Sequence, residues 1–398
     1  MSDLFITGIG HLTTNVGDPV ADAVVVVDEG TITYAESMAD APDQEGRKRL
    51  DVSGDAVIPG FVDAHTHLVF AGDRSDEFAR RLAGESYTDI AASGGGILST
   101  VKPTRSASEE TLFDLAAQRV WTMIRGGTTT VEIKSGYGLD LETELRLLRV
   151  ARRIGDELPV TVRTTFLGAH SIPLEYRSDR EGYVDLVINE MLPAAADLAD
   201  FCDVFVEDGV FGVDEARTIF EAAEALGLPA RVHAEQLSHL GGAALAAEIG
   251  AASADHLDFV TPDDAAALAA AGVTCVLVPG AAYTLRTPQP SGRTLWDAGC
   301  TVALATDCNP GTSYIETMGL VISLGVVQMG LTVEEVIWAA TRGGALSLRL
   351  EDRGLIKEGS PADLLVLDAP TPAHIPYRPA SNLARTVIKE GSVIVGEP

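Results

Sequence analysis

Lysine is scarce in this sequence of 398 residues, which contains only Lys48, Lys102, Lys134, Lys357 and Lys389. Aspartate and glutamate number 58 against 29 lysines and arginines, so the formal net charge is −29. A chain this acidic argues against nucleic acid as a partner, because phosphates would be repelled. An acid-rich, lysine-poor surface suits a cytoplasm of high salt, where screening shortens the range of self-repulsion to about 3 Å at 1 M. We therefore predict a halophile protein that loses structure when desalted.

Other absences narrow the class of protein further. The cysteines have no Cys-x-x-Cys spacing, which predicts buried, reduced thiols. They are Cys202, Cys275, Cys300 and Cys308. No signal peptide is evident, and the uncharged run at residues 265–285 is rich in Ala and Gly with Pro279 inside it, which predicts a buried helix, turn and strand rather than a membrane span. We expect a cytoplasmic globular protein with no membrane partner.

Short apolar strands alternate with amphipathic helices through the middle of the chain. The candidate strands are residues 128–133, 160–166, 204–206, 230–233, 274–278 and 301–305. One helix is predicted from about residue 142 to 154, and another from Thr332, where Thr332 and Glu335 can form a capping box. This alternation is typical of an α/β protein built as a (β/α)8 barrel of the TIM type.

Both ends of the chain consist of short strands without a helix-length period. These are residues 4–6, 23–27 and 31–33 near the start and residues 362–367, 386–388 and 392–395 near the end. Because both ends are β and the middle is not, we predict that the two ends combine. Residues 1–58 and 360–398 would form a small β-sandwich domain, and residues 59–359 the barrel.

Four metal-type residues stand at predicted strand ends. His65 and His67 close a short apolar strand, and alternation places both on one face. His233 and Asp307 end two later strands, and barrel enzymes keep their chemistry at the carboxyl ends of the strands. Each residue alone could be structural. Three imidazoles and a carboxylate together suit Zn²⁺ or Fe²⁺ and leave room for a water molecule.

The strand that ends in His-x-His resembles the start of the amidohydrolase superfamily barrel, and longer stretches resemble its imidazolonepropionase family. These stretches are residues 133–139, 166–170, 233–237 with 241–242, 253–257 and 306–312, so the resemblance covers essentially the whole chain. It implies a hydrolase of cyclic-amide carbon–nitrogen bonds that converts 4-imidazolone-5-propanoate to N-formimidoyl-L-glutamate in histidine degradation. It also implies one Zn²⁺ or Fe²⁺/Fe³⁺ per subunit and a homodimer.

The resemblance also implies roles for individual residues. Asp307 resembles the aspartate that takes the proton of the attacking water, besides binding the metal. His256 resembles the histidine that orients the nucleophile or steadies the oxyanion, although it could be a core histidine bonded to a carbonyl. The residues that the resemblance assigns to substrate are Arg74, Tyr87, Tyr137, His170, Gln236, Asn309, Gly311 and Thr312.

The assigned substrate contacts have chemical reasons and simpler alternatives. A guanidinium at Arg74 suits a substrate carboxylate, but Arg74 could be a surface arginine and Tyr87 a packing residue. Gln236 can bond a ring nitrogen but cannot carry a proton, so we expect it to bind substrate only. The glycine run at 94–96 lacks a following Gly-Lys-Ser/Thr, so it is not a phosphate loop.

Lys134 raises the question of metal number. Many superfamily members bridge two metals with a carboxylated lysine at a strand end. The stretch 133–138 around Lys134 instead resembles imidazolonepropionases, whose members use one metal, so we expect one ion. Two further functions stay open: another cyclic amidase or amino-purine or pyrimidine deaminase on the same barrel, and a metal-binding protein without activity. A pocket suited to an acidic side chain argues against the deaminase, and competent residues at every catalytic position argue against the inactive protein.

Overall fold

The computed structural model describes residues 3–44, 46–85 and 95–396. Tyr87 and Gly94, both considered above, lie outside the described residues.

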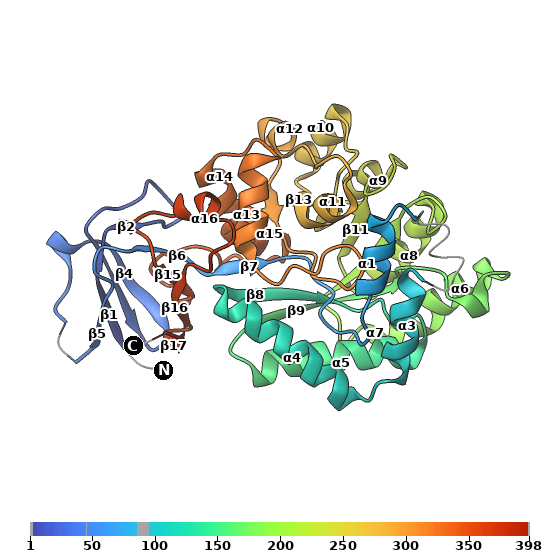
Figure 1. Cartoon of the computed structure of the whole chain (residues 1–398), viewed down its shortest axis with the longest axis horizontal. Helices are drawn as coiled ribbons and strands as arrows, with labels where there is room; N and C mark the ends of the chain where they lie inside the picture. Colours follow the sequence, from blue (N-terminus) through green and yellow to red (C-terminus); the bar gives the residue numbers. More distant parts are fainter. Residues whose placement is uncertain (1–2, 45, 86–94, 397–398) are drawn as a thin grey trace.

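Eight parallel strands form the centre of the larger part of the molecule (Figure 1). They are β7 (Phe61–Asp63), β8 (Thr128–Lys134), β9 (Thr161–Ala169), β10 (Phe201–Val206), β11 (Ala230–Ala234), β12 (Ser253–His256), β13 (Thr274–Leu277) and β14 (Val302–Leu304). Each pairs with the next strand along the chain. Beyond β7 and β14, His67 N donates to Cys308 O at 2.9 Å and Asp307 N donates to His65 O at 3.0 Å. These bonds join the first strand to the last, so the predicted barrel is confirmed.

Helices surround the barrel strands (Figure 1). They are α1 (Ser75–Leu82), α3 (Ile97–Ser106), α4 (Glu109–Arg125), α5 (Leu141–Glu157), α6 (Arg180–Leu186), α7 (Leu192–Ala195), α8 (Val213–Ala225), α9 (Gly242–Glu248), α10 (Pro262–Ala271), α11 (Pro279–Leu285), α12 (Gly292–Asp297), α13 (Met318–Val327), α14 (Val333–Trp338) and α15 (Gly344–Ser347); α16 (His374–Tyr377) lies between C-terminal strands. The capping box of α14 is confirmed, with Thr332 N donating to Glu335 Oε2 at 2.7 Å. The helix predicted near residues 142–154 is α5, which Asp140 caps by accepting from Thr143 N.

Two smaller sheets are built from both ends of the chain and lie to one side of the barrel (Figure 1). One has the order β4-β3-β1-β5, with β1 (Leu4–Ile9), β3 (Ala23–Asp28), β4 (Thr31–Ser37) and β5 (Lys48–Asp51). The other has the order β17-β16-β15-β6-β2, with β2 (His11–Leu12), β6 (Ala56–Pro59), β15 (Leu364–Leu367), β16 (Ala384–Lys389) and β17 (Ser392–Val395). Leu4, Val25, Val57, Leu364 and Ile388 belong to one buried cluster, so the two sheets pack on each other. The β-sandwich of both ends is confirmed, whereas the exact domain boundaries stay predictions.

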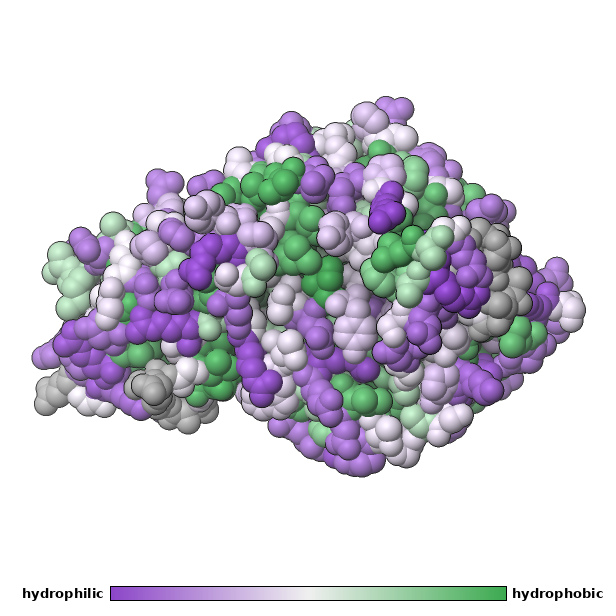
Figure 2. All heavy atoms as spheres, in the orientation of Figure 1, coloured by the Kyte–Doolittle hydropathy of each residue, from purple (hydrophilic) through white to green (hydrophobic). Residues whose placement is uncertain are grey.

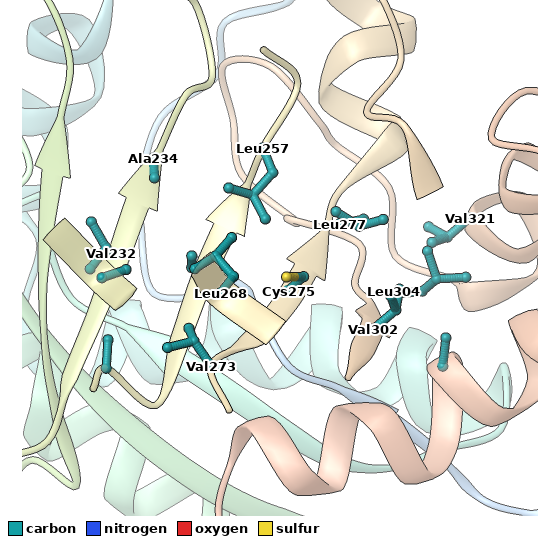
Figure 3. Packing of buried hydrophobic residues seen from close by; sticks show 14 of the residues in the cluster. Val232, Ala234, Leu257, Leu268, Val273, Cys275, Leu277, Val302, Leu304 and Val321 are labelled. Atoms are coloured by element: carbon teal, nitrogen blue, oxygen red, sulfur yellow. The ribbon is translucent and has the colours of Figure 1, made fainter. Parts of the chain in front are cut away.

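An apolar layer joins the barrel strands to the helices outside them. Val232, Cys275 and Leu304 of the strands belong to one buried cluster with Leu268 of α10 and Val321 of α13. In Figure 3, Cys275 lies near Leu268 and Leu304 lies near Val321. Each such buried aliphatic side chain contributes about 1.5–3 kcal/mol relative to exposure. This layer fixes the strands, and the strand ends hold the polar residues described below.

The surface agrees with the acidic composition. Hydrophilic residues cover much of the viewed face, with apolar patches between them (Figure 2). Among the residues that the structure describes, no helix combines the length and the apolar character needed to cross a bilayer.

Candidate active site

Three buried histidines converge at the carboxyl ends of the barrel strands. His65 and His67 follow β7, and His233 lies on β11. One ring nitrogen of each lies within 4.8 Å of the others. Asp307, which follows β14, places Oδ1 3.6 Å from His65 Nε2 and 3.7 Å from His67 Nε2. The residues that the sequence analysis grouped as metal ligands therefore lie together.

The polar atoms at this point fit a divalent cation. His65 Nε2, His233 Nε2 and Asp307 Oδ2 are buried and have no hydrogen-bond partner in the described part of the chain. Buried polar atoms are ordinarily paired, so an ion that ligates them would remove the deficit. Burial lowers the pKa of all three histidines well below the usual value, which favours the neutral imidazole that binds metals. The geometry and chemistry of the triad are consistent with a divalent-metal site.

Two carboxylates fix the orientation of the ligand rings. His65 Nδ1 lies 2.6 Å from Asp255 Oδ2, and His233 Nδ1 lies 2.9 Å from Asp203 Oδ1. Because an ionised carboxylate only accepts, each Nδ1 carries the proton and each Nε2 keeps its lone pair for a metal. Nothing in the local sequence marks either aspartate as a partner of a ligand histidine.

A buried network of ion pairs holds these two carboxylates in place. Lys134 Nζ donates to Asp203 Oδ2 at 2.7 Å and to Glu132 Oε1 at 2.9 Å, and lies 3.4 Å from Asp255 Oδ2. Arg231 Nη2 donates to Asp255 Oδ2 at 3.3 Å. Burial disfavours the charged forms of these groups. The facing charges outweigh it at Lys134, whose pKa they raise, and at Asp255, whose pKa Arg231 and Lys134 lower. Burial outweighs the facing charges at Glu132 and Asp203 and raises the pKa of both carboxyls. Lys134 is thus an ion-pairing residue within the barrel.

The segment that carries His65 and His67 is tied to its neighbours. Asp63 accepts from Thr306 N at 3.0 Å and from Thr306 Oγ1 at 2.6 Å, which links the ends of β7 and β14. Thr66 Oγ1 donates to Glu132 O at 2.6 Å. The histidine pair is therefore fixed on both sides by adjacent strands.

A cavity of about 430 Å³ opens directly onto the triad. It is lined by His67, His233, His256 and Asp307 and by all but one of the predicted substrate residues, namely Arg74, Tyr137, His170, Gln236, Asn309, Gly311 and Thr312. The exception is Tyr87, which lies outside the described residues. The cavity therefore gathers side chains from distant parts of the sequence beside the metal site, while their contacts with substrate stay predictions.

Arg74 is partly buried, and its guanidinium is held in a fixed orientation. Its Nε and Nη2 donate to Glu77 Oε2 at 3.1 and 2.9 Å, and Glu77 also accepts from Gly96 N at 3.1 Å. Nη1 lies against Gly311, where a Cβ would overlap it. The glycine thus lets the loop after β14 approach the guanidinium. Arg74 is not a loose surface arginine.

Asn309 organises the same loop. Its Oδ1 accepts from Gly311 N and from Thr312 N, both at 2.8 Å, and its Nδ2 donates to Asp307 O at 2.7 Å. The side chain therefore shapes the loop between the metal site and Arg74.

His170 and Tyr137 form an aromatic wall beside the metal site. The His170 ring stacks on His67 with centroids 5.0 Å apart, and Tyr137 lies 5.4 Å from His170. Nδ1 of His170 lies 3.0 Å from Gly136 O, so Nδ1 donates and Nε2 is left as an acceptor. Burial lowers the pKa of His170 to about 4 and raises the pKa of Tyr137. At neutral pH both side chains are uncharged.

His256 lies beside two metal-site histidines. Its ring centroid is 5.3 Å from that of His65 and 5.2 Å from that of His233. Its buried Nδ1 has no hydrogen-bond partner among the described residues, and burial lowers its pKa to about 4. This environment differs from that of a core histidine bonded through Nδ1 to a carbonyl.

Further cavity residues escaped the sequence analysis. Phe205 lines the cavity and lies opposite His233 on the neighbouring strand, with ring centroids 5.6 Å apart. Arg81 of α1, seven residues after Arg74, also lines the cavity. Period-2 alternation from Asp203 makes Phe205 an inward residue, but an aromatic residue at a strand end carries no signal for chemistry.

Comparisons with known proteins agree with this geometry. A family model described as "Amidohydrolase family" matches residues 56–394. An imidazolonepropionase of Haloarcula marismortui is 47% identical over 380 residues, covering 94% of this chain and 90% of that protein. An imidazolonepropionase of Myxococcus xanthus is 49% identical over 383 residues, covering 95% and 91%.

Solved structures with low identity share the fold. A 5-methylcytosine deaminase from Klebsiella pneumoniae is 18% identical with a TM-score of 0.75, covering 99% of this chain and 98% of that chain. An adenosine deaminase from Xanthomonas campestris with bound zinc is 19% identical with a TM-score of 0.73, covering 99% and 93%. These likenesses concern the fold alone, whereas the two relatives at 47% and 49% identity match nearly the full length. The chain therefore belongs to the amidohydrolase family and, within it, to the imidazolonepropionases.

Proposed function

We propose that this protein hydrolyses the cyclic amide of 4-imidazolone-5-propanoate to N-formimidoyl-L-glutamate. One observation carries the proposal: a single cavity connects the neutral histidine triad to Arg74. The metal site suits attack on a ring carbonyl, and the guanidinium in the same cavity suits the propionate carboxylate. The identity to imidazolonepropionases supports the same substrate.

The residues at the metal site have separate tasks in this proposal. His65, His67, His233 and Asp307 would hold one Zn²⁺ or Fe²⁺/Fe³⁺ per subunit. When bound, such an ion polarises the ring carbonyl and lowers the pKa of a water to about 7. Asp307 takes the proton of the attacking water and delivers it to the leaving ring nitrogen. His256 stabilises the charge that develops on the carbonyl oxygen.

The other cavity residues orient the substrate. Arg74 would bind the carboxylate through the edge that Glu77 leaves free, and the loop at 309–312 would close around the same end. Tyr137 offers a neutral hydroxyl donor, and His170 offers an Nε2 acceptor to a ring N–H. Gln236 would bond the ring without carrying a proton.

A single metal ion fits the environment of Lys134. Carboxylation requires a neutral amine, but Lys134 lies fully buried between Asp203 and Glu132 as an ammonium. Phe205 lies opposite His233 on the neighbouring strand, and its side chain has no atom that could bridge two metal ions. We further propose a cytoplasmic location and a homodimer, as the family resemblance implies.

The rival activity is deamination of an amino-purine or pyrimidine on the same barrel. Such a substrate lacks a carboxylate and would gain nothing from Arg74. The cavity contains the guanidinium of Arg74 together with the metal-site residues, which favours an acidic substrate over a neutral base.

The test is turnover of 4-imidazolone-5-propanoate by the purified protein in molar salt, with and without a chelator. We expect formation of N-formimidoyl-glutamate that the chelator abolishes and added metal restores. Asp307→Asn should remain folded and lose about 10²–10⁴-fold in kcat, as removal of a positioned acid–base group does. Absence of product from folded, metal-loaded protein would contradict the proposal, and turnover of amino-purines instead would favour the deaminase. Binding of metal without any turnover would favour the inactive protein.

A further inference from the structure

Glu144 is a fully buried carboxylate that none of the roles above uses. It lies in the first turns of α5, and its side chain turns back toward the loop that follows β8. Its Oε1 accepts from Gly138 N at 2.8 Å and from Leu139 N at 2.7 Å, and its Oε2 accepts from Gly136 N at 2.8 Å. A carboxylate that accepts several backbone N–H groups forms strong, charge-assisted bonds.

The loop around Glu144 has a conformation that needs support. Gly136 has φ +104° and Leu139 has φ +55°, so both ends of the loop lie in the left-handed region. That region costs a non-glycine residue such as Leu139 free energy. Gly138 also approaches closely, since a Cβ there would lie 2.8 Å from Glu144 N and 2.9 Å from Glu144 Oε1. The three N–H groups therefore converge because the carboxylate holds them.

The loop carries the aromatic wall of the substrate cavity. Tyr137 stands between Gly136 and Gly138, and its ring lies 5.8 Å from that of His67. The carbonyl of Gly136 accepts from His170 Nδ1 at 3.0 Å. The peptide group that contains this carbonyl lies between the peptide groups of the Gly136 N–H and the Gly138 N–H, and both of these N–H groups donate to Glu144. Displacement of the loop would move the hydroxyl of Tyr137. It would also break the hydrogen bond from His170 Nδ1 to Gly136 O that fixes the tautomer of His170.

Glu144 does not serve as an ordinary cap of α5. The N-cap is Asp140, which accepts from Thr143 N at 2.8 Å. The backbone N–H groups bound by Glu144 all belong to residues that precede the helix. Its contacts are therefore directed to the substrate loop.

We propose that Glu144 is a positioning residue of the active site, which holds the loop of residues 135–139 so that Tyr137 and His170 meet the substrate in a fixed geometry. This proposal takes the identity of the substrate from the proposed function. The expected effect of Glu144 on the tautomer of His170 does not depend on the substrate.

The first experiment compares Glu144→Gln with Glu335→Gln. An amide keeps one acceptor but turns an NH₂ group toward the N–H donors, which breaks the arrangement. Glu335 is the matched control, because it accepts a backbone N–H at the start of α14 and does not line the cavity. We expect Glu144→Gln to lose about 100-fold in kcat/KM, the scale of a misplacement of about 1 Å, at unchanged metal content. Glu335→Gln should keep the kcat/KM of the wild type.

A double-mutant cycle separates positioning from a general structural effect. If Glu144 acts through the hydroxyl of Tyr137 or the ring of His170, Glu144→Gln should lower kcat/KM by a smaller factor in a Tyr137→Phe or His170→Ala background than in the wild type. Full additivity with both partners would overturn the proposal, as would a Glu144→Gln variant that lowers the urea midpoint but keeps the kcat/KM of the wild type.

Two further measurements cover the remaining outcomes. If Glu144→Gln does not fold, Gly138→Ala displaces the same loop while the carboxylate stays; a folded Gly138→Ala variant with the KM and kcat of the wild type would contradict the inference. Nitrogen NMR of the imidazole of His170 needs no substrate. We expect a proton on Nδ1 in the wild type and a mixed tautomer in Glu144→Gln; an unchanged tautomer would refute the link. Failure of turnover by the wild type, with this shift still present, would count against the proposed function alone.

Discussion

Replacing Lys134 by methionine tests whether the buried ionic network supports the metal site. Lys134 Nζ contacts Asp203 at 2.7 Å, Glu132 at 2.9 Å and Asp255 at 3.4 Å, and all four side chains are fully buried. Methionine has a similar length without a charge. The substitution therefore keeps the packing and removes the cation.

The magnitude follows from which carboxylate loses its partner. Arg231 still faces Asp255 at 3.3 Å and Glu132 at 3.7 Å, so Asp203 is the carboxylate left with only His233. Breaking a buried pair by removing one partner costs about 3–5 kcal/mol, and the remaining contacts favour the lower end. We expect Lys134→Met to destabilise the metal-free protein by about 3 kcal/mol, or roughly 100-fold in the ratio of folded to unfolded protein. Saturating divalent metal should recover part of this loss, since it binds the folded state.

The assay is urea unfolding of metal-free and metal-loaded protein in molar salt, with metal affinity measured by chelator competition. Lys357→Met is the matched control, because Lys357 is exposed and its substitution should change stability by no more than about 0.5 kcal/mol. Because Asp203 orients the ring of the ligand His233, its disturbance should also weaken metal binding about 10–100-fold. Equal urea midpoints and equal metal affinity for both variants would refute the reasoning.

Three other predictions follow from single features. Arg74→Ala should raise KM about 10–100-fold, the scale of losing a charge-assisted bond of about 1.5–3 kcal/mol, with kcat nearly unchanged; a loss confined to kcat would place Arg74 in the transition state instead. Burial raises the pKa of Asp258 to about 8, against about 3.9 when unfolded. The folded state then binds more protons than the unfolded state between these values, so this carboxyl lowers stability as pH rises from about 4 to about 8. Asp258→Asn should therefore be more stable than wild type at pH 8 but not at pH 4, measured by urea unfolding; an equal difference at both pH values would contradict this. Finally, the melting temperature should be higher in about 2 M KCl than in about 0.1 M, because salt screens the net charge; equal melting would argue against salt adaptation.

The periodicity of the sequence predicted most strands but not all their limits. The sequence predicts a strand at residues 160–166, whereas β9 continues to Ala169. The extension passes through Gly168, which reads as a break in sequence but in the fold makes room for the ring of Phe166. The apolar pattern does not predict β12, because three of its four residues, Ser253, Asp255 and His256, are polar. An apolar pattern does not detect a strand whose inward face is built for chemistry.

The metal-type residues could be predicted because each stands at a strand end, where residue type and position both carry information. The network beneath them could not be predicted, because it depends on pairing between strands. Asp203 lies on β10, and its partners lie on β8 and β11. Only the register brings them together. Lys134 illustrates the limit: its position suggested a metal-bridging role, and its surroundings make it an ion-pairing residue.

The charges in and beneath the centre also bear on the number of ions. In their ionised forms, the three buried carboxylates Glu132, Asp203 and Asp255 exceed the two buried cations Lys134 and Arg231 by one negative charge. Asp307 adds a second. One divalent cation among the three neutral histidines balances these charges, whereas two would leave an excess of two positive charges beside the cavity. Isolated charge in a buried site is costly. With these groups ionised, the charge balance is consistent with the proposal of one ion per subunit.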